Sequence, residues 1–434
     1  MYIRHLKRTK RHLLSKSKWK LRLIFWGSAI VVGAIAAVFA LLAHAADNFF
    51  HQLHGNQPWL AYAITPIGLA LIALMTRRLF PGAEGSGIPQ AIAALSMHNH
   101  GLRSKILSLR LAFAKITLTC LGLLCGASIG REGPTVHVGA SIMYSLRRIA
   151  PFRGNDMTRG LILAGGAAGI SAAFNTPLAG ILFAIEEMSR SYENRTSGIL
   201  LIAVVLAGVT AIGILGNYTY FGSNSAILPL NSAWLAVLIC GLAGGLLGGL
   251  FASGLIYGNK RISGIVSTHP VMLALGCGLI LSLLGYLSGG TTYGTGYEEA
   301  KALVTGGEVH SGFTIMKLLA TTVSYLSGIP GGIFAPSLSI GAGLGAELHA
   351  LIPNTPFAAM VMLGMVGYFV GVVQTPITAL VIVMEMNDDT AMLLPLMATA
   401  LIAKGVSHLV CPKPIYQALA DAYLAHNIKP VSAN

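Results

Sequence analysis

Long apolar stretches recur along the whole chain, and they constrain its fold more than any other feature. They lie near residues 23–46, 59–76, 106–129, 161–185, 199–216, 233–257, 271–288, 314–329, 338–352, 357–384 and 391–411. Only 10% of the 434 residues are charged, whereas 54% are hydrophobic. A soluble domain of this size needs more charged surface. The sequence therefore predicts an all-α membrane protein that crosses the bilayer several times.

Several of these stretches are interrupted by Gly or Pro, and their lengths do not match one simple span each. A membrane tolerates such breaks only where they are buried in protein or line a cavity. The chain contains 52 glycines, which fits helices that approach closely and helices that are broken. We therefore expect tilted, broken and re-entrant helices.

Basic residues gather at the start of the chain. Nine of the 29 Lys and Arg residues lie within residues 1–22, directly before the apolar stretch 23–46. The positive-inside rule predicts a cytoplasmic N-terminal arm. The apolar stretch is about the length of a full span and is longer than the core of a cleaved signal peptide. A nucleic-acid-binding tail is the alternative, and the membrane-spanning pattern disfavours it.

One charged pair stands between apolar residues, where a membrane protein tolerates charge least. Arg131 and Glu132 belong to the sequence GREGP at residues 130–134. The same scaffold returns 202 positions later as GIFAP at residues 332–336, with Ile and Phe in place of the charged pair. Pro suits the first turn of a helix, so each break predicts a helix N-terminus with free N–H groups. Two such N-termini indicate a shared anion site within the bilayer.

An ordered series of matches indicates an internal repeat. The offset is 202 at first and 199 further on, and the pairs are Lys115 with Lys317, Gly126 with Gly328, Gly130 with Gly332, Pro134 with Pro336, Thr176-Pro177 with Thr375-Pro376, and Glu186 with Glu385. A weaker match relates the sequence GSG at residues 85–87 to GTG at residues 294–296. Coincidence in a Gly-rich chain is the alternative, and the order of the series argues against it. Repeats with matched breaks are typical of transporters whose site lies between the two copies.

The repeat sets the predicted domain boundaries. A basic arm at 1–22 precedes a first transmembrane repeat at 23–216, and a second repeat follows at 232–426. A polar loop at 217–231 joins the two repeats, and a short tail at 427–434 ends the chain without a soluble C-terminal domain. The sequence alone leaves open whether the two copies are parallel or inverted.

Glu132 has two protonation states with different consequences. A deprotonated carboxylate could itself occupy the anion-binding end of the helix. A protonated one loses that attraction and could swing aside, so one residue would serve as gate and proton carrier. The alternative is a structural ion pair between Arg131 and Glu132 at a helix start.

Three further features offer hydrogen-bond donors to an anion. Gly85 and Gly87 permit unusual backbone angles around the hydroxyl of Ser86, before a helix that starts near Pro89. The hydroxyl of Tyr416 could donate to an anion without bringing a competing charge. The backbone N–H groups of the second break are also available, and they belong to Ile333, Phe334 and Ala335. The simpler alternatives are a helix cap, an interfacial aromatic anchor and a helix kink.

Two adjacent acids, Glu186 and Glu187, end the apolar segment 180–185. An ionisable residue within a span costs roughly 2.5–3.5 kcal/mol on insertion scales, which makes it a functional candidate. One of the two could relay protons. The alternative is a hydrated, helix-capping pair at the inner membrane surface.

The sequence contains no motif for enzymatic or metal chemistry. The five cysteines show no C-x-x-C spacing, and no H-E-x-x-H is present. No Ser/His/Asp or Cys/His set stands near a motif, which disfavours an intramembrane hydrolase. A cation carrier should have an acid-rich site, and the one predicted here is built from helix N-termini. We expect no enzyme, no cofactor and no metal site.

The motifs GSGIP, GREGP and GIFAP, the Glu186-Glu187 pair and Tyr416 in a Pro-x-Tyr context together resemble the ClC family of chloride channels and chloride/proton antiporters. The motifs cover nearly the whole chain and occur in family order. The resemblance implies an all-α homodimer in which each subunit has its own anion pathway between two inverted-topology repeats.

The resemblance also implies roles for the anion-binding residues. Ser86 and Tyr416 would hold the central anion from the inner side. The backbone N–H groups of Ile333, Phe334 and Ala335 would line the pathway beyond it. The helix N-termini along the pathway would include Gly85, Gly87, Arg131 and Gly133. Ser86 at its position is like family members that favour chloride over nitrate, and GREGP together with Tyr416 disfavours a fluoride-specific protein.

Two carboxylates would move protons by the same resemblance. Glu132 corresponds to the gating glutamate, and Glu187 corresponds to the internal proton-transfer glutamate of the exchangers. The chain departs from many exchangers after GSGIP, because it has Gln90, Ala91 and Ile92 where they have further acids. The sequence thus predicts chloride transport in exchange for protons, with a passive, gated chloride channel as the alternative. The short form of the chain suggests a bacterial inner membrane.

Overall fold

The computed structural model describes residues 16–149, 152, 154–190, 197–216, 219–222, 226–229, 232–308 and 310–427, and most of them lie in helices. Within these ranges, strand pairing is limited to two isolated bridges, Gly85 with Pro330 and Gly130 with Gly332. The all-helical prediction is therefore confirmed.

The two repeats contain helices in the same order. Those of the first repeat are α2 (Lys16–Asn56), α3 (Pro58–Arg78), α4 (Ile88–Ser96), α5 (His100–Ile106), α6 (Leu109–Leu124), α7 (Glu132–Ser145), α8 (Asn155–Phe174), α9 (Pro177–Phe183) and α10 (Ser197–Leu215). Those of the second repeat are α11 (Leu235–Thr268), α12 (Pro270–Leu287), α13 (Tyr297–Val304), α14 (Phe313–Leu326), α15 (Phe334–His349), α16 (Phe357–Val373), α17 (Pro376–Asn387) and α18 (Leu393–Val410), followed by α19 (Ile415–Asn427). A π-helical turn at Ala184–Ser189 continues α9, and 3₁₀ turns lie at Leu146–Arg148 and Ser232–Trp234.

Eight of the described helices are long and apolar enough to cross a membrane, which confirms the multi-span prediction. Large apolar side chains such as Leu71, Leu201 and Leu283 are more than half exposed, at 54%, 51% and 57%. Lipid tails are as apolar as Leu, so a bilayer suits these surfaces. Helices α4, α7 and α15 are shorter, begin at the predicted breaks, and are buried over most of their length. They are the broken helices that the Gly and Pro pattern predicted.

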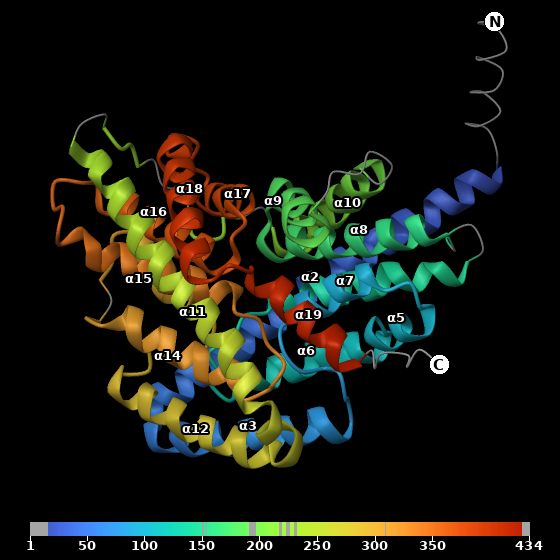
Figure 1. The fold of residues 1–434 in the computed structure, drawn as a ribbon, viewed down its shortest axis with the longest axis horizontal. Coiled ribbons are helices and arrows are strands. Elements are labelled where there is room, and N and C mark those ends of the chain that lie inside the picture. The colour runs from blue at the N-terminus through green and yellow to red at the C-terminus, as the bar shows by residue number, and fades with distance from the viewer. Residues whose placement is uncertain are drawn as a thin grey trace, which may run out of the picture.

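The packing of the first repeat recurs in the second. Helix α8 packs against α7, α9 and α10, and α16 packs in the same way against α15, α17 and α18 (Figure 1). Between the repeats, Gly130 and Gly332 exchange both of their backbone hydrogen bonds, each 2.7 Å long from nitrogen to oxygen. A mutual exchange between residues at matching positions is what an approximate two-fold axis between the copies would give. The internal repeat is therefore a structural repeat.

A second mutual contact joins α9 to α17, which lie side by side near the top of Figure 1. The Glu186 carboxylate accepts hydrogen bonds from the first turn of α17, the shortest being 2.7 Å from Thr378 N. The Glu385 carboxylate accepts them from the first turn of α9, the shortest being 2.9 Å from Ala179 N. A carboxylate stabilises a helix N-terminus. Each repeat thus caps a helix of the other.

The predicted arm, loop and tail are described only in part. Helix α2 runs without a break from Lys16, so the end of the predicted arm at 1–22 continues directly into the first span, and residues 1–15 lie outside the described residues. In the loop 217–231, only 219–222 and 226–229 are described, and Phe221 N donates a 3.0 Å hydrogen bond to Met386 O. Residues 428–434 of the predicted tail lie outside the described residues.

Candidate functional site

The break at residues 130–134 places a carboxylate between the two repeats. Helix α7 begins at Glu132, whose side chain is fully buried. Its Oε2 accepts a 3.4 Å hydrogen bond from Ala335 N in the first turn of α15. Its Oε1 has no hydrogen-bond partner among the described residues and lies 4.0 Å from Nε of Arg131. The ion pair with Arg131 is therefore long, and the carboxylate lies at a helix N-terminus of the other repeat.

The second break supplies that N-terminus. Ile333 precedes α15, which starts at Phe334, so the N–H groups of both residues have no carbonyl of an earlier helical turn to bond. Both side chains are 1% exposed. The ring of Phe334 packs against those of Phe174 and Phe369, with centroids 5.3 and 4.4 Å away. This packing fixes the start of α15 in an apolar surrounding, where the field of free N–H groups is strong.

Ser86 lies at the start of a third buried helix. It stands between Gly85 and Gly87, which have φ angles of +69° and +101°, and α4 begins directly afterwards. Its hydroxyl is buried and has no hydrogen-bond partner among the described residues. A Cβ atom at Gly133 would overlap the Ser86 hydroxyl, so the hydroxyl lies against the first turn of α7. The two predicted motifs GSGIP and GREGP therefore meet.

Tyr416 joins the same region from the C-terminal helix. It lies in the first turn of α19, which crosses the junction of the repeats in Figure 1. The side chain is 1% exposed, and its hydroxyl has no hydrogen-bond partner among the described residues. Glu132 and Glu187 are both close enough to interact electrostatically with it. A buried hydroxyl without a partner costs free energy, which indicates a donor reserved for a ligand.

The structure gives the adjacent acids Glu186 and Glu187 different surroundings, which the sequence could not distinguish. The Glu186 carboxylate caps α17, as the helix-capping alternative proposed. Glu187 is 1% exposed, and neither of its carboxylate oxygens has a hydrogen-bond partner among the described residues. Both lie in the π-helical turn Ala184–Ser189, and such turns are frequent at functional sites. Arg190 is the cation close enough to interact electrostatically with Glu187.

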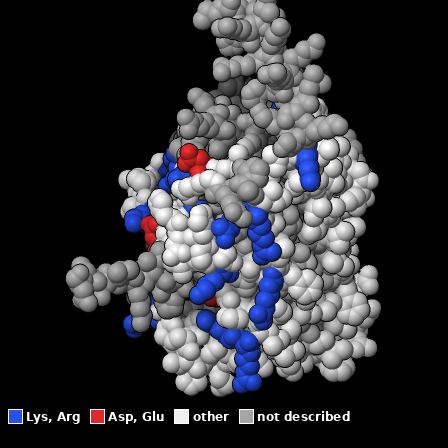
Figure 2. All heavy atoms as spheres, turned by 90° about the vertical axis from the view of Figure 1, so that its right-hand side faces the viewer, with Lys and Arg blue, Asp and Glu red and all other residues white. Residues whose placement is uncertain are grey.

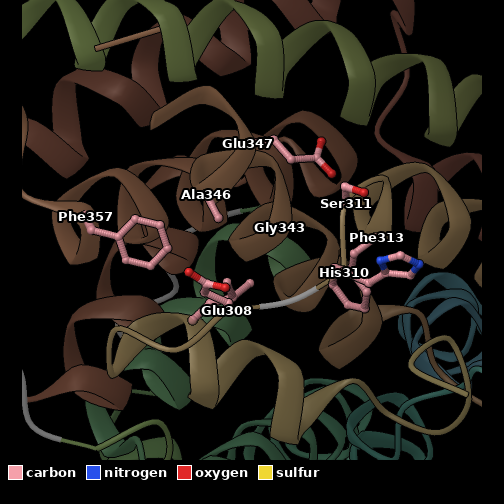
Figure 3. A pocket seen from close by; sticks show the side chains of 9 residues that line it. Glu308, His310, Ser311, Phe313, Gly343, Ala346, Glu347 and Phe357 are labelled. Carbon is pink, nitrogen blue, oxygen red and sulfur yellow. The ribbon is translucent and has the colours of Figure 1, made fainter. Parts of the chain in front are cut away.

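One pocket of the described structure is lined by other residues. The pocket of Figure 3 lies elsewhere, between the loop that precedes α14, helix α15 and the start of α16. Its lining residues are Leu303, Glu308, His310, Ser311, Phe313, Gly343, Ala346, Glu347 and Phe357. None of them belongs to the predicted pathway. The side chains of Ser86, Glu132, Glu187 and Tyr416 are all buried.

Sequence reasoning missed several buried polar contacts. It matched Lys115 with Lys317 but gave them no role, although both are fully buried and each donates to three successive carbonyl groups. It also passed over Asp47, whose carboxylate reaches Thr295 in the second repeat. A charged residue in an apolar stretch was the signal that could have identified each of them.

The fold and site together define a class of protein. It is a multi-span helical membrane protein whose broken helices direct N–H groups to one buried region, together with hydroxyls that have no partner among the described residues. Such a site suits an anion. Residues 68–408 match the family described as voltage gated chloride channel. The chain belongs to this family, the CLC family of anion transport proteins.

Solved structures agree with this assignment. A slow cyanobacterial Cl⁻/H⁺ antiporter is 28% identical with a TM-score of 0.78, and the match covers 93% of this chain and 98% of that one. A CLC-type fluoride/proton antiporter is 24% identical with a TM-score of 0.78, covering 93% and 99%. A eukaryotic CLC transporter is 23% identical with a TM-score of 0.73, covering 93% and 74%. The latter two similarities concern the fold alone.

Proposed function

We propose that this protein exchanges chloride for protons across a membrane. The observation that carries the proposal is a pair of buried carboxylates: one lies at a helix N-terminus that could bind an anion, and the other has no hydrogen-bond partner among the described residues. Glu132 accepts from the N-terminus of α15, where an anion would bind. Glu187 is buried with both oxygens unpaired among the described residues. Carboxylates in such surroundings are suited to take up and release protons.

Chloride would bind through hydroxyl and backbone donors. Ser86 and Tyr416 each offer a buried hydroxyl that has no other partner among the described residues. Further along, the N–H groups of Ile333, Phe334 and Ala335 would bind the anion once the Glu132 carboxylate has left them. Gly85 and Gly87 allow the loop around Ser86 to turn, and Arg131 and Gly133 belong to the start of α7.

Exchange follows from competition for one position. A deprotonated Glu132 occupies the donors at α15 and excludes chloride. Protonation removes its charge, so chloride displaces it and the proton leaves with the side chain. Glu187 would supply or receive protons from the opposite side, because it is a buried carboxylate whose oxygens have no hydrogen-bond partner among the described residues. The related Cl⁻/H⁺ antiporter of known structure supports this choice by its similarity.

The test uses purified protein in liposomes. An imposed chloride gradient is expected to drive protons against their own gradient, measured with a pH electrode outside the vesicles. Chloride leak without proton movement would support the alternative, a passive gated channel. Fluoride in place of chloride should give weaker exchange, because the sequence has GREGP and Tyr416.

The membrane orientation follows from the distribution of charge. Figure 2 shows Lys and Arg gathered on the face at the right of Figure 1, where α5 lies, with few Asp and Glu. Lys20 at the start of α2 and Lys105 in α5 are exposed basic residues of these helices. The positive-inside rule supports a cytoplasmic face here and a cytoplasmic N-terminus. We also propose a homodimer in the inner membrane, as the resemblance to the family suggests. Labelling of single cysteines at these positions from either side tests the orientation.

A further inference from the structure

Each repeat contains a loop with two left-handed glycines before a short helix. Gly85 and Gly87 precede α4, and Gly294 and Gly296 precede α13 with φ angles of +64° and +76°. Positive φ angles suit glycine, which has no Cβ. Between the glycines stands Ser86 in the first loop and Thr295 in the second. Both loops therefore present a hydroxyl at the same point.

A buried lysine supports each loop in the same way. Lys115 Nζ donates to three successive carbonyl groups that end at Gly85, at 2.9 to 3.3 Å. Lys317 Nζ donates to three successive carbonyl groups that end at Gly294, at 2.9 to 3.0 Å. Both ammonium groups are fully buried. A buried positive charge under the loop favours an anion above it.

The two loops differ in what their hydroxyls bind. The Ser86 hydroxyl has no partner among the described residues. The Thr295 hydroxyl and backbone N–H both donate to Oδ2 of Asp47, at 3.1 and 3.2 Å. Asp47 belongs to α2, and a Cβ atom at Gly294 would overlap its Oδ1. The glycine thus admits a carboxylate to the second loop.

Two more groups surround this carboxylate. The hydroxyl of Ser339 is fully buried, has no partner among the described residues, and lies against Gly296, where a Cβ atom would overlap it. Nδ1 of His51 lies 3.3 Å from Oδ1 of Asp47. The second loop therefore has the donors of an anion site and a buried cation, Lys317, which also interacts electrostatically with Glu299 of α13. At its edge lies an additional hydroxyl without a partner among the described residues.

We propose that residues 294–296 form a second anion-binding loop, whose resident anion is the carboxylate of Asp47. The inference rests on the proposed function of the Ser86 loop, of which this loop is the structural copy. Its free ligand would be a small monovalent inorganic anion such as chloride or bromide. The carboxylate excludes that ligand as long as it accepts both hydrogen bonds from Thr295.

Removal of the carboxylate tests the proposal. Crystals of the Asp47→Ala variant soaked in bromide are expected to show an anomalous peak within hydrogen-bond distance of Thr295 N and Oγ1, and another at Ser86. The wild-type protein should show the Ser86 peak without the Thr295 peak. The double variant Asp47→Ala, Thr295→Val keeps the shape of the side chain, removes the hydroxyl and should lose the added peak.

The outcomes separate the two proposals. Bromide at Ser86 without bromide at Thr295 in Asp47→Ala overturns the second loop and leaves the proposed function intact. Bromide at neither loop overturns both. A peak at Thr295 that persists unchanged in the double variant also overturns the role of the loop hydroxyl.

A second measurement serves if Asp47→Ala does not fold. In Asp47→Ser, the shorter side chain leaves room for an anion. Replacing gluconate by chloride should raise the unfolding temperature of this variant more than that of the wild type, and Thr295→Val should remove the difference. Equal shifts in Asp47→Ser and the wild type would overturn the proposal.

Discussion

Two carboxylates lie at helix N-termini of the second repeat, and they are held differently. Glu132 accepts one hydrogen bond of 3.4 Å from Ala335 N, and its other oxygen has no partner among the described residues. Asp47 accepts two shorter ones, of 3.1 and 3.2 Å, from Thr295. By the two proposals, both would compete with anions for the same kind of donor. The number of donors and the length of the side chain distinguish them.

The difference indicates when a carboxylate serves as a gate. A hydrogen bond to a charged group contributes about 1.5–3 kcal/mol, so two of them hold Asp47 more firmly than one long bond holds Glu132. Glutamate also has one more rotatable bond than aspartate, so Glu132 can leave the helix terminus without moving the backbone. We infer that Glu132 is exchangeable and that Asp47 is fixed.

The largest expected effect is that of Glu132→Gln. The amide cannot take up and release a proton, so proton transport driven by a chloride gradient should fall to background while chloride flux continues. Liposomes with a pH electrode and a chloride electrode measure both. Asp47→Asn is the matched control, because a fixed carboxylate should not affect coupling. Undiminished proton transport in Glu132→Gln would refute the gate, and lost coupling in Asp47→Asn would refute the contrast between the two residues.

A similar loss of proton transport is expected for Glu187→Gln, while chloride flux continues. The matching position of the second repeat holds Met386, which has no proton to give, so only the first repeat has this group. Proton movement should fall to background in the same assay while chloride passes. Glu385→Gln changes the capping acid of the second repeat and is the control. Coupling that persists in Glu187→Gln would make Glu187 a structural carboxylate.

The sequence predicted the elements that depend on local structure. Gly and Pro at the breaks placed the starts of α4, α7 and α15 close to residues 88, 132 and 334, where the structure has them. The ordered matches also predicted the repeat. The boundary of the basic arm at residue 22 does not coincide with a break, because helix α2 continues through it. Basic residues are good helix formers, so charge alone did not mark a helix end.

Contacts between distant segments could not be predicted in this way. Asp47 and Thr295 are separated by 248 positions, and Glu186 and Thr378 by 192. Their approach depends on the two-fold relation between the repeats, which the sequence left open. The match of Glu186 with Glu385 suggested an equivalent role for both. That each would cap the helix of the other repeat became apparent only from the packing of α9 against α17.

Asp47→Ala should also lower the free energy of unfolding in the absence of halide. It leaves the N–H and hydroxyl of Thr295, which is 8% exposed, without their acceptor. A buried donor without a partner costs about 1–3 kcal/mol. Chemical denaturation in detergent, in a gluconate buffer, measures the loss. Asp47→Asn keeps an acceptor oxygen and should lose less; an equal loss in both variants would contradict the account.

The smallest expected effect is that of the two capping acids. Glu385→Ala removes the carboxylate from the first turn of α9, and loss of a helix cap costs about 0.5–2 kcal/mol. Glu186→Ala should cost more, because its carboxylate also accepts a 2.8 Å hydrogen bond from the Thr378 hydroxyl. Thr378→Val should cancel that excess, since it removes the hydroxyl and keeps the shape of the side chain. Thermal unfolding of the four variants, including Glu186→Ala with Thr378→Val, measures the order. A larger loss in Glu385→Ala than in Glu186→Ala would contradict the contribution of the Thr378 hydroxyl.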